Sequence, residues 1–141
     1  TTGFPRGKAD FSPREWEKPD EWPTDEFPYI ATTGRLLYHY HSGSMTRRSS
    51  TGEFIKEMYI EINPEDAAAL GVEAGEKLKV TSRRGEVSGD AKITERVPAG
   101  TVFLPFHFSE TSANILTSAR IDPDSKTPGF KVSAVKLEKV V

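Results

Sequence analysis

An acid-free, basic segment rich in hydroxyl groups is the part of this sequence best suited to chemistry. No aspartate or glutamate lies between Glu26 and Glu53, although the whole chain carries a formal net charge of −2. The basic side chains in this interval are Arg35, His39, His41, Arg47 and Arg48. Arginine forks onto phosphate oxygens, hydroxyls donate further hydrogen bonds, and Gly34 and Gly43 let backbone N–H groups approach closely. The segment is therefore a candidate anion-binding site, and the alternative is a solvated polar loop.

Histidine and serine side chains in and near this segment raise two alternatives, a metal site and a nucleophile. His39 and His41 would share one face of a strand, and His107 could add a third imidazole ligand. Their sequence surroundings are apolar or basic and offer no carboxylate or thiolate, so we expect no metal ligands in this chain. Ser42 and Ser44 lie near His41, but neighbours on a strand point to opposite faces and no orienting acid is close. We therefore expect no catalytic residue either.

Length and composition place the chain among small globular domains. It has 141 residues, 35% of them hydrophobic, which suits one domain with its own core. A net charge of −2 gives no general attraction to nucleic acid or to an anionic membrane surface. The absence of cysteine excludes a disulfide, a thiol nucleophile and iron–sulfur ligation from within these residues. The sequence contains no signal-peptide pattern and no apolar run long enough to span a membrane.

The beginning of the sequence indicates a piece of a larger enzyme. It starts with Thr1, Thr2 and Gly3, without an initiator methionine. Residues 1–30 are predicted to be a proline-rich connector, because proline disfavours both the interior of a helix and a central strand. Aromatic residues recur through it, so we expect it to pack along a surface. These residues are Phe4, Phe11, Trp16, Trp22 and Phe27.

Residues 31–141 are predicted to form one β-barrel domain. Composition and alternating hydrophobicity predict strands over residues 35–41, 58–62, 77–82, 86–94, 101–106 and 130–140. Asn63 as the N-cap, Pro64 at the first helical position and Gly71 at the end predict a short helix, and residues 83–85 predict a hairpin turn. About six strands with one or two short helices favour a mainly β, closed barrel, since closure removes exposed sheet edges.

Three segments resemble one known family. Residues 33–48 read TGRLLYHYHSGSMTRR, residues 62–85 join INPEDA to a helix and hairpin, and residues 113–131 contain ANILT, DP and KTPGFK. Together they resemble the C-terminal molybdopterin-dinucleotide-binding domain of the molybdopterin oxidoreductase superfamily, and within it that of formate dehydrogenase alpha (catalytic) subunits. The resemblance covers nearly the whole chain and implies a six-stranded double-psi β-barrel. Gly129 departs from the family, which commonly has an acidic residue there.

The resemblance also implies the cofactor and the residues that bind it. The cofactor would be two molybdopterin guanine dinucleotides (bis-MGD) around molybdenum or tungsten. Arg35 is the first choice for a charge-assisted contact, and Asn114 would hydrogen-bond a pterin or guanine edge. The implied cofactor-binding residues are Gly34, Arg35, Leu36, Leu37, His39, His41, Ser42, Gly43, Ser44, Met45, Thr46, His107, Phe108, Asn114, Phe130 and Lys131.

In the parent enzyme, the resemblance implies oxidation of formate to CO2, with a catalytic cysteine or selenocysteine and an iron–sulfur cluster supplied by other segments. The expected partners are upstream domains of the same polypeptide and electron-transfer subunits, without nucleic acid or membrane contact. The expected location is the cytoplasm, with the periplasm as the alternative. Three other functions stay open. The same domain could belong to a nitrate reductase or another molybdenum or tungsten enzyme, a small barrel could bind single-stranded nucleic acid, or it could only recruit protein partners.

Overall fold

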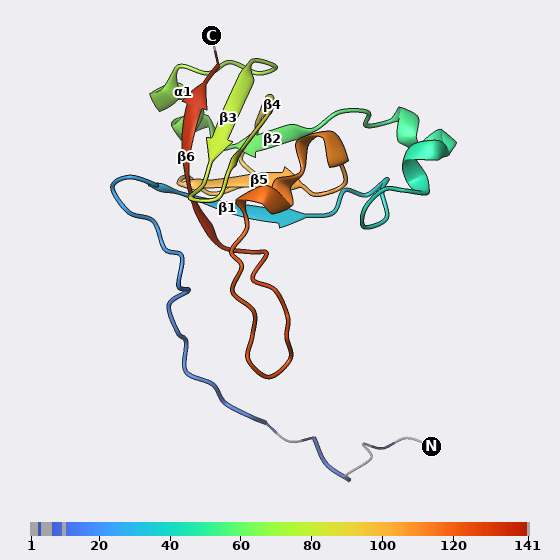
Figure 1. The fold of residues 1–141 in the computed structure, drawn as a ribbon, viewed down its shortest axis with the longest axis vertical. Helices are drawn as coiled ribbons and strands as arrows, with labels where there is room; N and C mark the ends of the chain where they lie inside the picture. The colour runs from blue at the N-terminus through green and yellow to red at the C-terminus, as the bar shows by residue number, and fades with distance from the viewer. Residues whose placement is uncertain (1–2, 4–6, 10, 141) are drawn as a thin grey trace.

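Six strands close into a barrel in the described part of the chain, which comprises residues 3, 7–9 and 11–140 of this computed structural model (Figure 1). Phe4 and Pro5 of the predicted connector lie outside the described residues. The strands are β1 (Tyr29–Gly34), β2 (Tyr59–Ile62), β3 (Lys77–Thr81), β4 (Glu86–Ile93), β5 (Thr101–Pro105) and β6 (Ser133–Lys139). The predictions for β2 to β5 differ from these bounds by at most one residue at each end.

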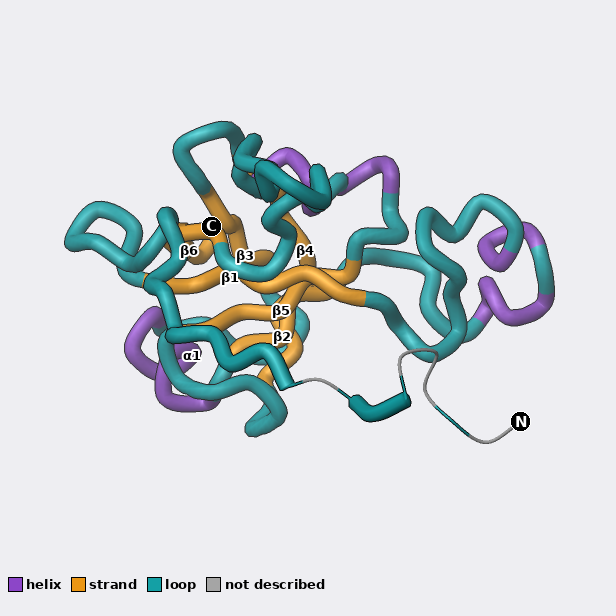
Figure 2. The backbone as a smooth tube through the Cα atoms, turned by 90° about the horizontal axis from the view of Figure 1, so that it is seen from below, coloured by secondary structure: helices purple, strands orange, loops and turns teal. Residues whose placement is uncertain are grey.

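The strand order around the barrel is β1-β5-β2-β4-β3-β6. Two pairs run parallel, β1 with β5 and β2 with β4, while the other neighbours run antiparallel. Figure 2 shows the strands gathered at the centre, with the helices outside them. The predicted mainly β, six-stranded double-psi barrel is confirmed.

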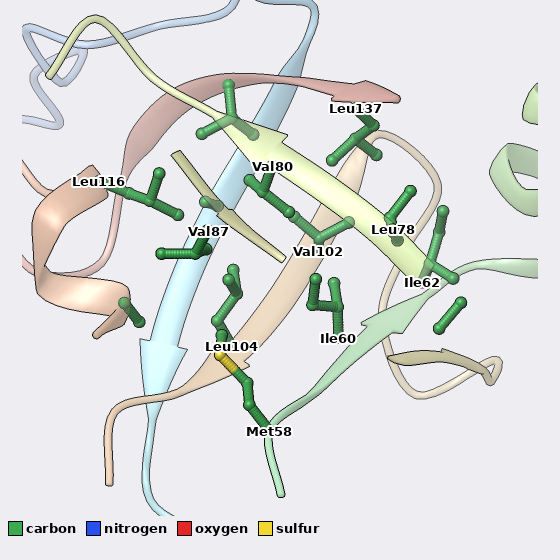
Figure 3. Packing of buried hydrophobic residues seen from close by; sticks show 14 of the residues in the cluster. Met58, Ile60, Ile62, Leu78, Val80, Val87, Val102, Leu104, Leu116 and Leu137 are labelled. Atoms are coloured by element: carbon green, nitrogen blue, oxygen red, sulfur yellow. The ribbon is translucent and has the colours of Figure 1, made fainter. Parts of the chain in front are cut away.

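Alternating burial along the strands fills the inside of the barrel. On β3, Leu78 and Val80 are buried, whereas Lys77 before them and Lys79 between them reach solvent. This period of two is the one that a strand with one buried face requires. Figure 3 shows how side chains from several strands meet in one cluster. The fully buried members include Ile60, Ile62, Leu78, Val80, Val102, Leu104, Leu116 and Val135.

The one α-helix in the described residues, α1 (Pro64–Leu70), follows its predicted capping signals. The side chain of Asn63 accepts a hydrogen bond from the N–H of Glu65 at 3.0 Å, and Pro64 occupies the first helical position. Gly71 ends the helix in the left-handed conformation, with a φ of 63°. No helix in the described part of the chain is both long and apolar enough to cross a membrane.

The prediction of a strand over residues 35–41 is wrong, because the strand here, β1, ends at Gly34. The parallel partner of β1 ends at Pro105, which has no N–H for a further ladder bond, and the N–H of Phe106 makes a last contact with the Gly34 carbonyl at 3.3 Å. The chain then turns, with the N–H of His39 donating to the carbonyl of Leu36 at 3.2 Å. The pattern that suggested a strand reflects exposed apolar side chains, since Leu37 is 90% exposed.

The N-terminal segment lies along the barrel in its last part. Phe27 is buried, with the guanidinium of Arg83 4.7 Å above its ring centre. Arg84 forms a bidentate ion pair with Glu21 and also donates a hydrogen bond to the carbonyl of Leu116 at 2.5 Å. Nearer the N-terminus the chain runs away from the barrel (Figure 1). The Phe11 side chain is almost fully exposed. The arginines of the β3–β4 hairpin therefore hold the segment that leads into β1.

Candidate functional site

A long excursion between β1 and β2 carries most of the candidate residues. It contains two short 3₁₀ helices, η1 (Thr46–Arg48) and η2 (Ser50–Glu53), and projects to one side of the barrel in Figures 1 and 2. We call its first part, residues 35–48, the basic loop. A stretch this long outside the sheet needs contacts of its own to hold one conformation. Two buried histidines supply these contacts.

His107, which follows β5, hydrogen-bonds to the backbone at both ends of the first turn of the basic loop, at Leu36 and at His41. Its side chain is only 1% exposed. The N–H of Leu36 donates to Nε2 at 2.8 Å, and Nδ1 pairs with the carbonyl of His41. A carbonyl only accepts, so Nδ1 carries the proton and Nε2 is the acceptor, which makes the imidazole neutral. Burial is the main cause that lowers the pKa of His107 and so favours this form.

His39 anchors the middle of the basic loop to the segment before β2. It is 4% exposed, and its Nε2 donates to the carbonyl of Ile55 across 3.1 Å. Its Nδ1 lies 3.0 Å from the hydroxyl of Thr46, which also accepts from the N–H of Tyr40 at 3.3 Å. The rings of His39 and His107 are neighbours, with centres 5.2 Å apart. Two of the three predicted histidines, His39 and His107, therefore use their ring nitrogens within the chain.

Two residues of the basic loop adopt left-handed backbone conformations. Gly43 has a φ of 72°, and His41 has a φ of 35°, which is uncommon for a residue with a side chain. A Cβ at Gly43 would lie 3.1 Å from the side chain of Arg47 and 3.4 Å from the carbonyl oxygen of His107. Glycine is thus required here for both its backbone freedom and its lack of volume.

Arg47 closes the far end of the basic loop onto the segment after β5. Its Nη1 and Nη2 donate to the two carboxylate oxygens of Glu110 at 3.0 and 2.7 Å. Its guanidinium carbon lies 5.3 Å from the ring centre of buried Phe108. Sequence reasoning did not connect Arg47 with Glu110, because only the closed barrel brings the two segments together. The hydrogen bonds from Arg47 hold the pKa of Glu110 at about 2.

This ion pair predicts a measurable pH response. Because the folded pKa of Glu110 is depressed from 4.5 to about 2, the stability that the pair contributes is present above pH 4.5 and is lost as the pH falls toward 2. An NMR titration of the side-chain carboxyl should give a midpoint near 2, and Arg47→Gln should return it toward 4.5. Ser109→Ala is the control and should move the midpoint little, because Ser109 contributes least to this depression. A wild-type midpoint near 4.5 would contradict the bidentate contact.

The exposed side chains of the basic loop form its outer surface. Arg35 makes no ion pair within the described residues, and the hydroxyl oxygens of Ser42 and Ser44 lie 3.3 Å apart. The exposed candidate residues here are Arg35, Leu37, His41, Ser42, Ser44 and Met45. Leu36 and Thr46 are partly buried. The loop therefore presents cationic, hydroxyl and apolar groups together.

The late loop before β6 is tied to the end of β1. The hydroxyl of Thr33 donates to the carbonyl of Phe130 at 2.9 Å, and Nζ of Lys131 donates to the carbonyl of Thr33 at 2.5 Å. Phe130 and Lys131 also line a cleft of about 410 Å³ against the N-terminal segment. Asn114 lies apart from them, exposed on η4 (Ala113–Leu116). Sequence reasoning placed Thr33 in the hydroxyl-rich segment but did not predict that it joins this loop to the base of the basic loop.

A second cleft, of about 450 Å³, opens beside the start of the basic loop. Arg35 lines it, together with Lys92 and Arg96. Lys92 donates to the buried carboxylate of Glu61 at 3.0 Å, which follows from the direct pairing of these residues across β2 and β4. Neither Lys92 nor Arg96 was identified from sequence, because no local pattern links them to the basic loop.

No group of three histidine, cysteine, aspartate or glutamate side chains could hold a metal ion in residues 3, 7–9 and 11–140. The strand geometry assumed for a shared face of His39 and His41 is also absent there, since His39 is buried and His41 is exposed. The described residues instead build a loop that buried histidines hydrogen-bond and whose exposed side chains are basic, hydroxyl and apolar, so this barrel is a candidate ligand-binding module.

Comparison with known proteins identifies the kind of module. Residues 29–134 match the family described as the molydopterin dinucleotide binding domain, which is most of the chain. The chain therefore belongs to this family. Acetylene hydratase from Pelobacter acetylenicus has the same fold, with a TM-score of 0.72 at 19% sequence identity over 82% of this chain and 19% of that one.

The curated relatives are much longer than this chain. It is 51% identical, over 96% of its length, to F420-dependent formate dehydrogenase 2 subunit alpha of Methanococcus maripaludis. It is 47% identical, over 95% of its length, to the F420-dependent formate dehydrogenase subunit alpha of Methanocaldococcus jannaschii. A nitrate reductase of Symbiobacterium thermophilum is 44% identical over 97% of the chain. The chain spans about a fifth of the length of each of these relatives.

Proposed function

We propose that this domain binds bis-MGD, with molybdenum or tungsten, in the alpha subunit of a formate dehydrogenase. The observation that carries the proposal is the basic loop. Two buried histidines hydrogen-bond its backbone, while the side chains of Arg35, Ser42 and Ser44 are exposed. The formate dehydrogenase alpha subunits at 47% and 51% identity support this choice of parent enzyme.

The groups of the basic loop suit a dinucleotide. A guanidinium such as that of Arg35 pairs with phosphate oxygens through two parallel hydrogen bonds, and the hydroxyls of Ser42 and Ser44, whose oxygens lie 3.3 Å apart, can also donate to an anion. Leu37 and Met45 offer exposed apolar surface to a planar ring system. Phe130 and Lys131 would meet the second pterin from the late loop, and Asn114 would bind a pterin or guanine edge.

The chemistry would come from the bound group and from other parts of the parent enzyme. When bound, such a metal–pterin centre supplies the two-electron redox chemistry that oxidation of formate to CO2 requires. This chain would bind and orient the cofactor, while upstream domains supply the catalytic residues and an iron–sulfur cluster. Electron-transfer subunits would be the further partners, and the cytoplasm the location. The 44% identical nitrate reductase favours a second candidate, the same domain in a nitrate-reducing enzyme.

The direct test uses the full-length protein that contains this chain. Mass spectrometry should find about one molybdenum or tungsten per polypeptide, and denaturation should release a guanine-containing pterin nucleotide. Formate-dependent dye reduction would assign the enzyme to formate oxidation, whereas nitrate-dependent dye oxidation would assign it to the second candidate. A folded protein without metal or pterin would overturn the proposal and favour nucleic-acid binding or partner recruitment.

Replacing Arg35 tests the role of the basic loop itself. Arg35→Ala should lower the retained metal and pterin about tenfold, because a charge-assisted hydrogen bond contributes about 1.5–3 kcal/mol. Retention is measured after gel filtration of the full-length protein. Arg14→Ala is the matched control, since Arg14 is also an exposed arginine but lies in the N-terminal segment. Equal retention in wild type and Arg35→Ala would remove Arg35 from the site.

A further inference from the structure

The hydrogen bonds of His107 join two points of the basic loop to the end of β5. Nε2 accepts from the N–H of Leu36 at 2.8 Å, and Nδ1 donates to the carbonyl of His41. The imidazole therefore bridges the start and the end of a short turn. Each ring nitrogen is matched to a backbone group of fixed polarity, so only the neutral ring protonated at Nδ1 satisfies both.

The backbone held by this bridge is one that the chain would not adopt by itself. His41 has a φ of 35°, and a left-handed residue with a side chain persists only where its surroundings enforce it. The bond from His107 to the carbonyl of His41 fixes the peptide that follows this residue. The carbonyl of His107 also lies 3.4 Å from where a Cβ of Gly43 would be, so the two left-handed residues pack against the same anchor.

We propose that His107 is a positioning residue for the cofactor, and that its neutral ring holds residues 36–43 in the conformation that presents the basic loop to the dinucleotide. This inference rests on the proposed function. His107 then acts through the backbone and not by contact with the cofactor, because both of its ring nitrogens are already engaged and its side chain is only 1% exposed.

The surroundings of the ring disfavour its protonation. Arg35, His39 and His41 act on it electrostatically from the basic loop, and Arg47, which pairs with Glu110, lies 5.3 Å from the ring centre of the next residue, Phe108. Burial, with these neighbours, lowers the pKa of His107 below 6.5, although the hydrogen bond to His41 opposes the change. A proton on Nε2 would remove the acceptor for the N–H of Leu36. The bridge is therefore intact above pH 6.5 and is lost as the pH falls through the lowered pKa.

Two variants separate the bridge from the bulk of the side chain. In His107→Gln, the amide oxygen can accept from Leu36 while the amide nitrogen donates to His41, and this group does not titrate. His107→Phe keeps an aromatic ring and loses both bonds. The third variant, Val80→Ala, is a control that removes methyl groups from a fully buried position on β3 and leaves the bridge intact.

The experiment measures retention of the native pterin by the full-length protein at pH 7.5 and at pH 5. His107→Phe should release it at least about tenfold faster than wild type at pH 7.5, and wild type should release it faster only as the pH falls through the lowered pKa of His107. His107→Gln should stay within about threefold of wild type at pH 7.5 and change little at pH 5. Val80→Ala should match wild type below its unfolding temperature. Retention by His107→Phe equal to that of wild type would overturn the proposal.

A second measurement does not depend on the cofactor. ¹⁵N NMR of the 141-residue chain should show His107 protonated at Nδ1 only, and His107→Phe should shift the amide signals of Leu36, His41 and Gly43. If the full-length protein carries no pterin but these signals behave as stated, the proposed function fails while the bridge stands. If His107 is protonated at Nε2, or if the Leu36 amide does not respond, the positioning role fails.

Discussion

Gly43→Val should lower the pterin retained by the full-length protein about a hundredfold while the barrel stays folded. The φ of 72° at Gly43 is strongly unfavourable for a β-branched residue, and a Cβ there would come within 3.1 Å of Arg47 and 3.4 Å of the His107 carbonyl. Backbone strain of this kind costs about 1–3 kcal/mol, and the crowding adds to it. The loop would relax into another conformation, and binding would have to reverse that change. Pterin released from equal amounts of purified protein measures the effect.

Gly75→Val provides the matched control. Gly75 also has a positive φ, of 85°, but a Cβ added there would have no atom within 4 Å. This variant should lose about 1–3 kcal/mol of stability through backbone strain and keep its pterin. If both variants lost the cofactor equally, general destabilisation would explain the result and the basic loop would have no special role.

Leu104→Ala should destabilise the isolated chain by about 2–5 kcal/mol, because it removes a fully buried side chain and leaves a cavity. Leu104 lies on β5 near the middle of the cluster in Figure 3, where little can collapse into the space. Urea unfolding followed by circular dichroism measures the change. The shift should be in the midpoint and not in the slope, since the surface exposed on unfolding stays nearly the same.

Leu37→Ala is the same chemical change at an exposed site. Leu37 is 90% exposed, so its replacement should alter the free energy of unfolding by less than about 0.5 kcal/mol. A loss below about 1 kcal/mol for Leu104→Ala would mean that the barrel interior is loosely packed. The pair therefore tests the assignment of inside and outside on which the barrel depends.

Local signals predicted the elements whose geometry is set by neighbours in sequence. Asn63, Pro64 and Gly71 mark α1 correctly, because caps act within one helical turn. The hairpin at Arg83 was also predictable, since β3 and β4 adjoin it and pair antiparallel. Composition and alternating hydrophobicity along the sequence placed β2 to β5 for the same reason. The family follows from residues 33–48, whose sequence pattern is long and specific.

Local sequence signals could not predict contacts between residues that are far apart in the sequence. The strand prediction for residues 35–41 failed because the end of β1 is set by Pro105 on another strand. Sequence reasoning gave His39 and His107 as cofactor-binding residues, which no observation tests, and it could not show that their ring nitrogens pair with Ile55, Leu36 and His41. Only a closed fold shows that these histidines are buried. The cofactor contacts of the exposed loop residues stay predictions.

The parallel strand pairs have a consequence for how the protein acquires its structure. Ile30 pairs with Thr101, and β6 at the end of the barrel must join both β1 and β3. Topologies dominated by such nonlocal pairing fold slowly, since the entropy of closing large loops is lost before the contacts form. During synthesis on a ribosome, β1 could pair with neither β5 nor β6 until most of the domain had been made. The basic loop, which depends on His107 for its shape, would be among the last parts to become ordered.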